Sequence, residues 1–256
     1  MFSVKEIFST IQGEGSKSGR PAIFVRFTGC NLWSGREKDR GKGKGECSLW
    51  CDTDFVTGDK LSADDLYKRL IFLTKEWHPE SRMVVFTGGE PCLQLKKEEA
   101  SKVVAKLLKD GWTVSVETNG TISVDDCNVL QALYIHHKGH ITVSPKALLS
   151  NMNYERIIDT KNIKESPEQN ISSYMPEGLK HLNVFYGNDL KIIIPSPFSK
   201  LLTFIKETTR FNHYYLQPMD SQNKQENSKN LIETLELAKE HGYAISIQTH
   251  KLVGLP

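Results

Sequence analysis

Short apolar runs alternate with longer segments of helical periodicity along most of the chain. The runs are rich in β-branched and aromatic residues and end at glycine or at polar residues, a pattern typical of buried strands. We expect strands at residues 22–27, 83–87, 113–116, 141–143, 191–194, 214–217 and 244–248.

The segments between these runs carry helix signals. Ser62, followed three residues later by Asp65, has the form of a capping box, and apolar residues recur behind it at helical spacing. Residues 97–110 repeat apolar residues in the same way, and Gly111 supplies a helix stop. Helices are also expected near residues 199–208 and 228–241. Strands that alternate with helices predict an α/β fold with a mostly parallel sheet and flanking helices.

The length and composition favour one domain over residues 1–256, because 256 residues with 38% hydrophobic content can enclose a substantial single core. Two segments interrupt the regular order. Residues 149–188 are polar, contain two prolines and show no long apolar period, so we expect a peripheral insertion there. A glycine-rich, basic stretch near residues 34–46 is expected to be a second, solvated insertion.

Polar residues follow several of the predicted strands at their carboxyl ends. They are Cys30, Thr87–Glu90, Glu117–Asn119, Ser144–Lys146 and Gln217–Asp220. In parallel α/β folds these strand ends share one edge, and ligand chemistry is located there. The sequence therefore predicts a site on this rim.

Three of the five cysteines gather after the first predicted strand. Sixteen residues separate Cys30 from Cys47, and three separate Cys47 from Cys51. Three thiolates can hold an iron–sulfur cube and leave one iron open to a ligand that is not protein. A structural zinc is an alternative, although no histidine lies between Gly13 and Trp77 to complete it. Unligated core thiols are the third possibility.

Charge and targeting signals narrow the function classes. A formal net charge of +2 argues against a general polyanion binder, although the basic residues of the 36–44 stretch leave a zinc-stabilised RNA-binding module as an alternative. Residues 1–8 lack the apolar core of a signal peptide, and no run is long enough to span a membrane. We therefore expect a cytoplasmic protein with no membrane and no nucleic-acid partner, in which Cys92 and Cys127 are structural thiols.

Several short motifs together resemble the radical S-adenosylmethionine (SAM) superfamily and, within it, the 7-carboxy-7-deazaguanine synthase family of queuosine and deazapurine biosynthesis. They are Gln-Gly-Glu-Gly at 12–15, Cys-Asp-Thr-Asp at 51–54, Thr-Gly-Gly-Glu-Pro at 87–91 and Gln-Thr-His at 248–250. The similarity covers most of the chain outside residues 149–188. The cysteine spacing departs from the C-x3-C-x2-C pattern of most of the superfamily, although some members of this family carry a long first gap.

The resemblance implies a modified, partial (β/α) barrel and a lyase that converts 6-carboxy-5,6,7,8-tetrahydropterin to 7-carboxy-7-deazaguanine with loss of ammonia. It implies a [4Fe–4S] cluster on Cys30, Cys47 and Cys51, whose open iron binds SAM and cleaves it reductively to a 5′-deoxyadenosyl radical. It further implies Mg²⁺ on Thr53 with Asp52 in support, an external reductant such as a flavodoxin, and a homodimer. Another radical SAM enzyme, such as an activase of a partner protein, is the alternative.

The resemblance also assigns binding residues. For the pterin they are Ile11, Gln12, Gly13, Glu14, Arg26, Thr87, His250 and the C-terminal carboxylate of Pro256. For SAM they are Gly88, Gly89, Glu90, Glu117, Asn119, Ser144, Pro145, Lys146, Gln217, Pro218, Met219 and Asp220. The two glycines are expected to let the backbone approach the methionyl amino group, and Leu252, Val253 and Leu255 are expected to anchor the chain end.

Overall fold

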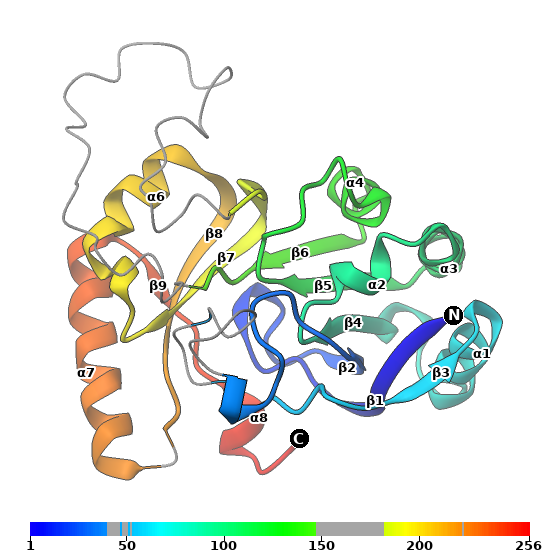
Figure 1. The fold of residues 1–256 in the computed structure, drawn as a ribbon, viewed down its shortest axis with the longest axis horizontal. Helices are drawn as coiled ribbons and strands as arrows, with labels where there is room; N and C mark the ends of the chain where they lie inside the picture. Colours follow the sequence, from blue (N-terminus) through cyan, green and yellow to red (C-terminus); the bar gives the residue numbers. More distant parts are fainter. Residues whose placement is uncertain (40–46, 48–50, 52, 147–181, 222) are drawn as a thin grey trace.

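The computed structural model describes residues 1–39, 47, 51, 53–146, 182–221 and 223–256. In these residues the chain forms a curved nine-stranded sheet in the order β3-β1-β2-β4-β5-β6-β7-β8-β9 (Figure 1). The strands are β1 (Phe2–Ile11), β2 (Pro21–Phe27), β3 (Asp59–Leu61), β4 (Met83–Gly88), β5 (Thr113–Thr118), β6 (Gly139–Val143), β7 (Tyr186–Ile194), β8 (Arg210–Pro218) and β9 (Ala244–Ile245).

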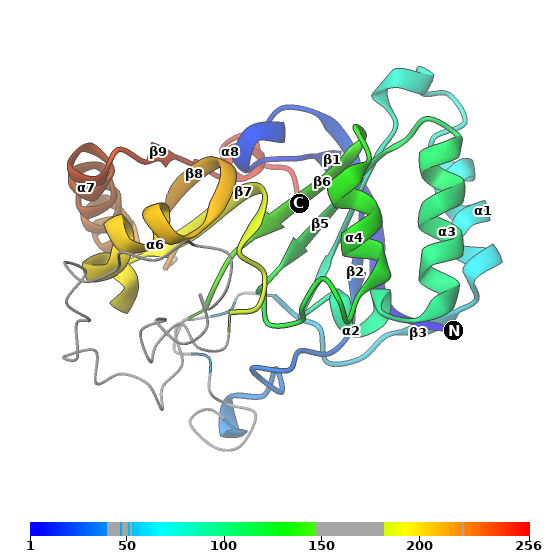
Figure 2. The ribbon, with the colours of Figure 1, turned by 90° about the horizontal axis from the view of Figure 1, so that it is seen from above.

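Most of the helices cover the outer face of the sheet. They are α1 (Ala63–Leu73), α2 (Cys92–Leu95), α3 (Glu98–Lys109), α4 (Asn128–Ile135), α6 (Leu202–Thr208) and α7 (Lys224–His241). The short helix α8 (Thr249–Leu252) instead belongs to the C-terminal segment, near the cavity. Helices α1, α3 and α4 lie beside the first half of the sheet, and α6 and α7 lie beside β7, β8 and β9 (Figures 1 and 2). The result is the α/β arrangement expected from the sequence, a partial barrel with an open side.

The pairing of the strands explains where their ends meet. From β2 to β9 every neighbouring pair is parallel, so the carboxyl ends of these strands share one edge. Strand β1 runs antiparallel to both β2 and β3. The turn between β1 and β2 therefore lies at the opposite edge of the sheet, where the parallel strands begin.

Local sequence signals account for most of the helices. The Ser62 hydroxyl accepts a hydrogen bond from the Asp65 amide at 3.1 Å, which confirms the predicted cap of α1. Helix α3 turns Val103, Val104 and Leu107 toward the core, and all three are buried. On the sheet side, the rings of Phe27 and Phe86 stack with their centroids 5.7 Å apart.

Some boundaries differ from those predicted. Strand β1 was not anticipated, because the alternation of buried Phe2 and Val4 is lost at a register shift between Val4 and Glu6. The strand predicted at 244–248 is wrong beyond Ile245, since β9 contains only Ala244–Ile245. Within the described residues, no helix is both long enough and apolar enough to cross a membrane.

The two expected insertions lie largely outside the described residues. Residues 40–46 and 147–181 belong to that part of the chain. The last residues of the 149–188 segment are described, and they join the main body: Leu182 and Val184 are buried, and the Asn183 amide donates to the Gly120 carbonyl at 2.7 Å.

Candidate active site

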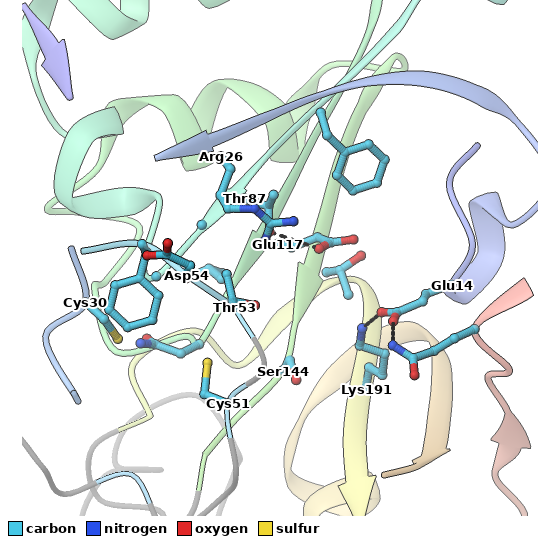
Figure 3. Close-up of a pocket in the computed structure, with 18 of the residues that line it drawn as sticks. Glu14, Arg26, Cys30, Cys51, Thr53, Asp54, Thr87, Glu117, Ser144 and Lys191 are labelled. Atoms are coloured by element: carbon cyan, nitrogen blue, oxygen red, sulfur yellow. Dashed lines mark hydrogen bonds and ion pairs between the residues drawn. The ribbon is translucent and has the colours of Figure 1, made fainter. Parts of the chain in front are cut away.

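A cavity of about 710 Å³ lies inside the curve of the sheet. Residues from β1, β2, β4, β5, β6, β7 and β8 and from the C-terminal segment line it. Figure 3 shows Cys30 and Cys51 on one side of this cavity, Glu14 and Lys191 on the other, and Arg26, Thr87 and Glu117 between them. The strand ends, the β1–β2 connection and the C-terminal segment therefore bring the predicted site residues into one space.

Most of the residues predicted from the sequence line this cavity. They are Ile11, Gln12, Glu14, Arg26, Cys30, Cys47, Cys51, Thr53, Thr87, Gly88, Gly89, Glu117, Asn119, Ser144, Lys146, Gln217, His250 and Pro256. Six predicted residues do not line it: Gly13, Glu90, Pro145, Pro218, Met219 and Asp220. Asp52 lies outside the described residues.

The three cysteines share one wall of the cavity. Cys47 is buried with Leu32, Trp33 and Phe55, and Cys30 and Cys51 pack against this cluster. Burial raises the pKa of the Cys30 thiol to about 11. By donor type, three thiols beside an apolar wall fit an iron–sulfur cluster. Among the described residues, no three His, Cys, Asp or Glu side chains are grouped closely enough to hold a metal ion.

Gly88 and Gly89 are required by packing of the backbone. A Cβ on Gly88 would lie 2.3 Å from the Phe27 carbonyl oxygen, and Gly88 has a φ of +140° that favours glycine. A Cβ on Gly89 would lie 2.2 Å from the Gly29 carbonyl oxygen and 2.9 Å from the Cβ of Cys30. Within the protein itself, these glycines allow the end of β4 to lie against the loop that carries Cys30.

Glu90 lies behind the cavity and is fully buried. Its Oε2 accepts the Asn119 amide at 2.7 Å, and its Oε1 accepts the Thr118 hydroxyl at 2.7 Å and the Cys92 amide at 2.9 Å. Burial raises the pKa of this carboxyl. The contacts join the end of β4 to the end of β5, so Glu90 holds the position of Asn119, which does line the cavity. Cys92 and Cys127 are both buried, as expected of structural thiols.

Glu117 connects three elements at the floor of the cavity. Its Oε1 accepts the Gln12 side-chain amide at 2.9 Å, and its Oε2 accepts the Thr87 hydroxyl at 3.2 Å. Gln12 follows β1, and Thr87 and Glu117 lie near the ends of β4 and β5. Residues that the resemblance assigns to two different ligands are therefore hydrogen-bonded to one another here.

Glu14 is paired with a buried lysine that the sequence did not single out. Glu14 forms an ion pair with Lys191 of β7 and also accepts the side-chain amides of Gln217 at 3.1 Å and Gln248 at 2.8 Å (Figure 3). Burial alone would raise the pKa of Glu14, but the charge of Lys191 and these hydrogen bonds lower it to about 2. The only sequence signal for Lys191 was a cation directly before three isoleucines.

The loop that carries Glu14 is held by a second polar group. Asp189 of β7 is buried, and its Oδ2 accepts the Ser16 amide at 2.8 Å while its Oδ1 lies 3.0 Å from Nδ1 of His213. The same Oδ2 lies 3.6 Å from Nε2 of His140. Burial opposes ionisation of Asp189, but His140 and Ser16 outweigh it and lower its pKa to about 2.

Arg26 and Thr53 both line the cavity. The Nε of Arg26 donates to Oε1 of Glu6 at 2.7 Å, and its guanidinium carbon lies 5.7 Å from the centroid of Phe8. Beside Thr53, Asp54 pairs with Lys5 at 2.5 Å. Arg26 is thus both paired and exposed to the cavity. Neither Lys5 nor Asp54 was anticipated as a lining residue.

The C-terminal segment closes one side of the site. The Thr249 amide donates to the Gly13 carbonyl at 3.0 Å, and a Cβ on Gly13 would lie 1.8 Å from Nδ1 of His250. Gly13 thus contacts His250 without lining the cavity. The Thr10 hydroxyl donates to an oxygen of the C-terminal carboxylate of Pro256 at 2.9 Å.

The expectation that apolar side chains anchor the chain end is wrong. Leu252 is 74% exposed and Val253 is 64% exposed, so hydrogen bonds rather than apolar packing hold the segment. Leu255 lines the cavity but is also exposed.

The residues predicted for SAM divide into two groups. Ser144 and Lys146 line the cavity, and the Lys146 amine donates to the Ser144 hydroxyl at 2.8 Å. Burial lowers the pKa of Lys146. By contrast, Asp220 and Met219 do not line the cavity. Asp220 accepts from the Asn227 side-chain amide at 2.8 Å and pairs with Lys251, itself a lining residue, at 3.0 Å, and the Met219 amide donates to the Ile194 carbonyl at 2.7 Å.

Comparison with known proteins adds to this geometry. The chain is 33% identical to the 7-carboxy-7-deazaguanine synthase of Bordetella pertussis over 265 aligned residues, which span 100% of this chain and 99% of the relative. It is 35% identical to the synthases of Caulobacter vibrioides and Burkholderia multivorans, again over 100% of this chain and 99% of each relative. The chain belongs to the 7-carboxy-7-deazaguanine synthase family.

The fold agrees with this family membership. The crystal structure of QueE from Escherichia coli superposes with a TM-score of 0.57 and 22% sequence identity, covering 96% of this chain and 93% of that one. At this identity the superposition supports the 7-carboxy-7-deazaguanine synthase fold alone. No family model matches the chain.

Proposed function

We propose that this protein is a radical SAM carbon–nitrogen lyase that converts 6-carboxy-5,6,7,8-tetrahydropterin to 7-carboxy-7-deazaguanine with loss of ammonia. The single observation that carries the proposal is that one cavity contains both the three-cysteine wall and the polar residues of the family motifs. The family relationship over the full length of the chain supports the same reaction.

Cys30, Cys47 and Cys51 would hold a [4Fe–4S] cluster, since their thiols face one cavity and match its preferred donors. When bound, the cluster and SAM supply the radical chemistry, and the protein positions the reactants and excludes water. Residues at the ends of β4, β5 and β6 would hold SAM. Those that line the cavity are Gly88, Gly89, Glu117, Asn119, Ser144 and Lys146. Thr53 would offer an oxygen ligand to Mg²⁺.

The remaining lining residues suit a flat heterocycle with a carboxylate. The guanidinium of Arg26 offers a planar fork for the carboxylate. Gln12, which can both donate and accept, and Glu14, which accepts only, match the amide and amino edge of a pterin. The rings of Phe8 and Phe24 stack 5.5 Å apart in the same lining and provide an apolar surface beside Arg26.

The cellular arrangement also belongs to the proposal. We propose that residues 1–256 act as one radical SAM domain, that the enzyme is a homodimer, and that an external reductant such as a flavodoxin supplies the electron. A reducing cytoplasm would keep the three cavity thiols available for a cluster.

The test is turnover with the carboxylated tetrahydropterin, SAM and a reductant after anaerobic reconstitution, with the product identified by mass. Alanine at Cys30, Cys47 or Cys51 is expected to abolish both reductive SAM cleavage and product formation. Cys92→Ala and Cys127→Ala, which alter buried thiols outside the cavity, are the matched controls and should retain the cluster.

Three results would contradict parts of the proposal. A Cys47→Ala protein with a normal cluster and full activity would show that Cys47 is not a ligand. SAM cleavage without any pterin turnover would favour another radical SAM enzyme. A colourless reconstituted protein that contains zinc would exclude the radical SAM enzymes as a class.

A further inference from the structure

Lys191 occupies a costly position for a cation. It lies in β7 directly before Ile192, Ile193 and Ile194, and its side chain is only 8% exposed. Burying an ammonium group is unfavourable unless it is paired. The amine is nevertheless aimed into the cavity, where it meets Glu14 (Figure 3).

Glu14 is surrounded by groups from five parts of the chain. Gln217 of β8 and Gln248 of the C-terminal segment donate neutral hydrogen bonds to it. The other charged or titratable groups that face the pair are Glu117 of β5, Asp189 of β7, Lys146 after β6 and His250. Among the hydrogen-bond donors that the structure describes at this carboxylate, Lys191 alone brings a positive charge.

The charge state of Glu14 matters for recognition of a pterin edge. An ionised carboxylate only accepts hydrogen bonds and has about four lone-pair sites, three of which are taken by Lys191, Gln217 and Gln248. The remaining site can accept an N–H of the pterin. A protonated Glu14 would instead direct its O–H group at the N–H groups of the pterin, so that two donors would face each other. A buried carboxyl without a cationic partner tends toward this protonated form.

We propose that Lys191 is a positioning residue that keeps Glu14 ionised, so that Glu14 can accept a hydrogen bond from the amide and amino edge of the pterin. This inference rests on the proposed function. It is distinct from a purely structural ion pair, because it makes substrate affinity depend on the ionisation of Glu14.

The test uses reconstituted holoenzyme with SAM but without reductant, so that binding of 6-carboxy-5,6,7,8-tetrahydropterin is measured by calorimetry without turnover. Between about pH 6 and pH 9, the ratio of the dissociation constant of Lys191→Met to that of wild type is expected to fall as pH rises, because the buried Glu14 regains its charge. At the acid end we expect a loss of affinity of roughly tenfold or more, which corresponds to about 1.4 kcal/mol. Lys191→Arg should restore most of the affinity across the range.

Infrared spectroscopy of the same variants reports the protonation state of the Glu14 carboxyl directly. Lys191→Met should show a protonated carboxyl band that is lost in Lys191→Met/Glu14→Gln. Lys102→Met removes a lysine from an exposed Lys–Glu pair on α3 and serves as the matched control, with no change in either measurement.

Two results would overturn the proposal: a uniform loss of affinity at every pH, or a Glu14 that remains ionised in Lys191→Met. If wild-type enzyme does not bind the pterin at all, the proposed function fails. In that case the infrared measurement alone decides whether Lys191 controls the ionisation of Glu14.

Discussion

Replacing Glu90 by glutamine tests whether this residue supports the site from behind rather than touching a ligand. The glutamine carbonyl can retain the two hydrogen bonds made by Oε1, from Thr118 and Cys92. In the wild type, the Asn119 amide donates to Oε2 of Glu90 at 2.7 Å. In the variant, an NH₂ group takes the place of Oε2 and faces this amide. The substitution therefore replaces one charge-assisted hydrogen bond with two opposed donors.

The expected cost follows from that count. A hydrogen bond to a charged group contributes about 1.5–3 kcal/mol to stability, and leaving a buried amide without a partner costs a similar amount. The two figures describe the same lost contact and are not added together. We expect the free energy of unfolding to fall by about 2–3 kcal/mol. For a domain of this size this corresponds to a melting temperature lower by about 4–12 °C. Because Asn119 lines the cavity, affinity for SAM should fall as well.

The assay is thermal unfolding of reconstituted enzyme together with SAM binding by calorimetry. Glu98→Gln, which changes an 85% exposed carboxylate on α3, is the control and should leave both quantities unchanged. Burial raises the pKa of Glu90, so the folded state binds its proton more tightly than the unfolded state does. The stability difference between wild type and Glu90→Gln should therefore narrow as pH rises through the folded-state pKa. Weakened SAM binding with unchanged stability would refute this reasoning and favour direct contact with the cofactor.

Two further predictions concern other parts of the site. Asp189→Asn should lower the free energy of unfolding by about 2.6 kcal/mol near neutral pH, since the pKa of Asp189 is about 2 when folded and about 3.9 when unfolded. The stabilisation by ionised Asp189 is present above the pKa of the unfolded state and is lost as pH falls toward 2. Denaturant titrations in which wild type and Asp189→Asn differ by the same free energy of unfolding at every pH would contradict this prediction. Thr53→Ala should weaken the dependence of turnover on Mg²⁺ and leave the cluster spectrum unchanged, whereas equal wild-type rates with and without a chelator would remove the metal from the mechanism.

The sequence was sufficient to predict the rim of the site, because the signals that identify each strand and its carboxyl end lie within a few neighbouring residues. Short apolar runs identify parallel strands, and the carboxyl ends of such strands lie together whatever their spacing along the chain. Thr87 and Glu117 could therefore be placed beside Cys30 before any contact was known. Ser62 and Gly111 bounded two helices for equally local reasons, a cap and a stop.

The contacts that cross the chain could not be predicted in this way. Lys191 looked like an ordinary polar residue at the start of a strand, and nothing near it in sequence indicates Glu14 as its partner. Glu90 belongs to a motif that suggested a ligand contact, but only the packing of β5 beside β4 shows that it faces Thr118 and Asn119. Strand β1 escaped detection because the register shift between Val4 and Glu6 interrupts the period of its buried residues.

The contacts of Glu14 also determine when the site can form during synthesis of the chain. Its partners Lys191, Gln217 and Gln248 follow it by 177, 203 and 234 residues. At about 5–20 residues per second, a ribosome adds Gln248 roughly 10–50 s after Glu14. Until then the β1–β2 hairpin can pair its strands locally, but the carboxylate stays in water without its lysine. The hairpin folds early, whereas the cavity is completed only when the C-terminal segment has left the ribosome, so a nascent chain that stalls before residue 248 carries most of the sheet and no finished site.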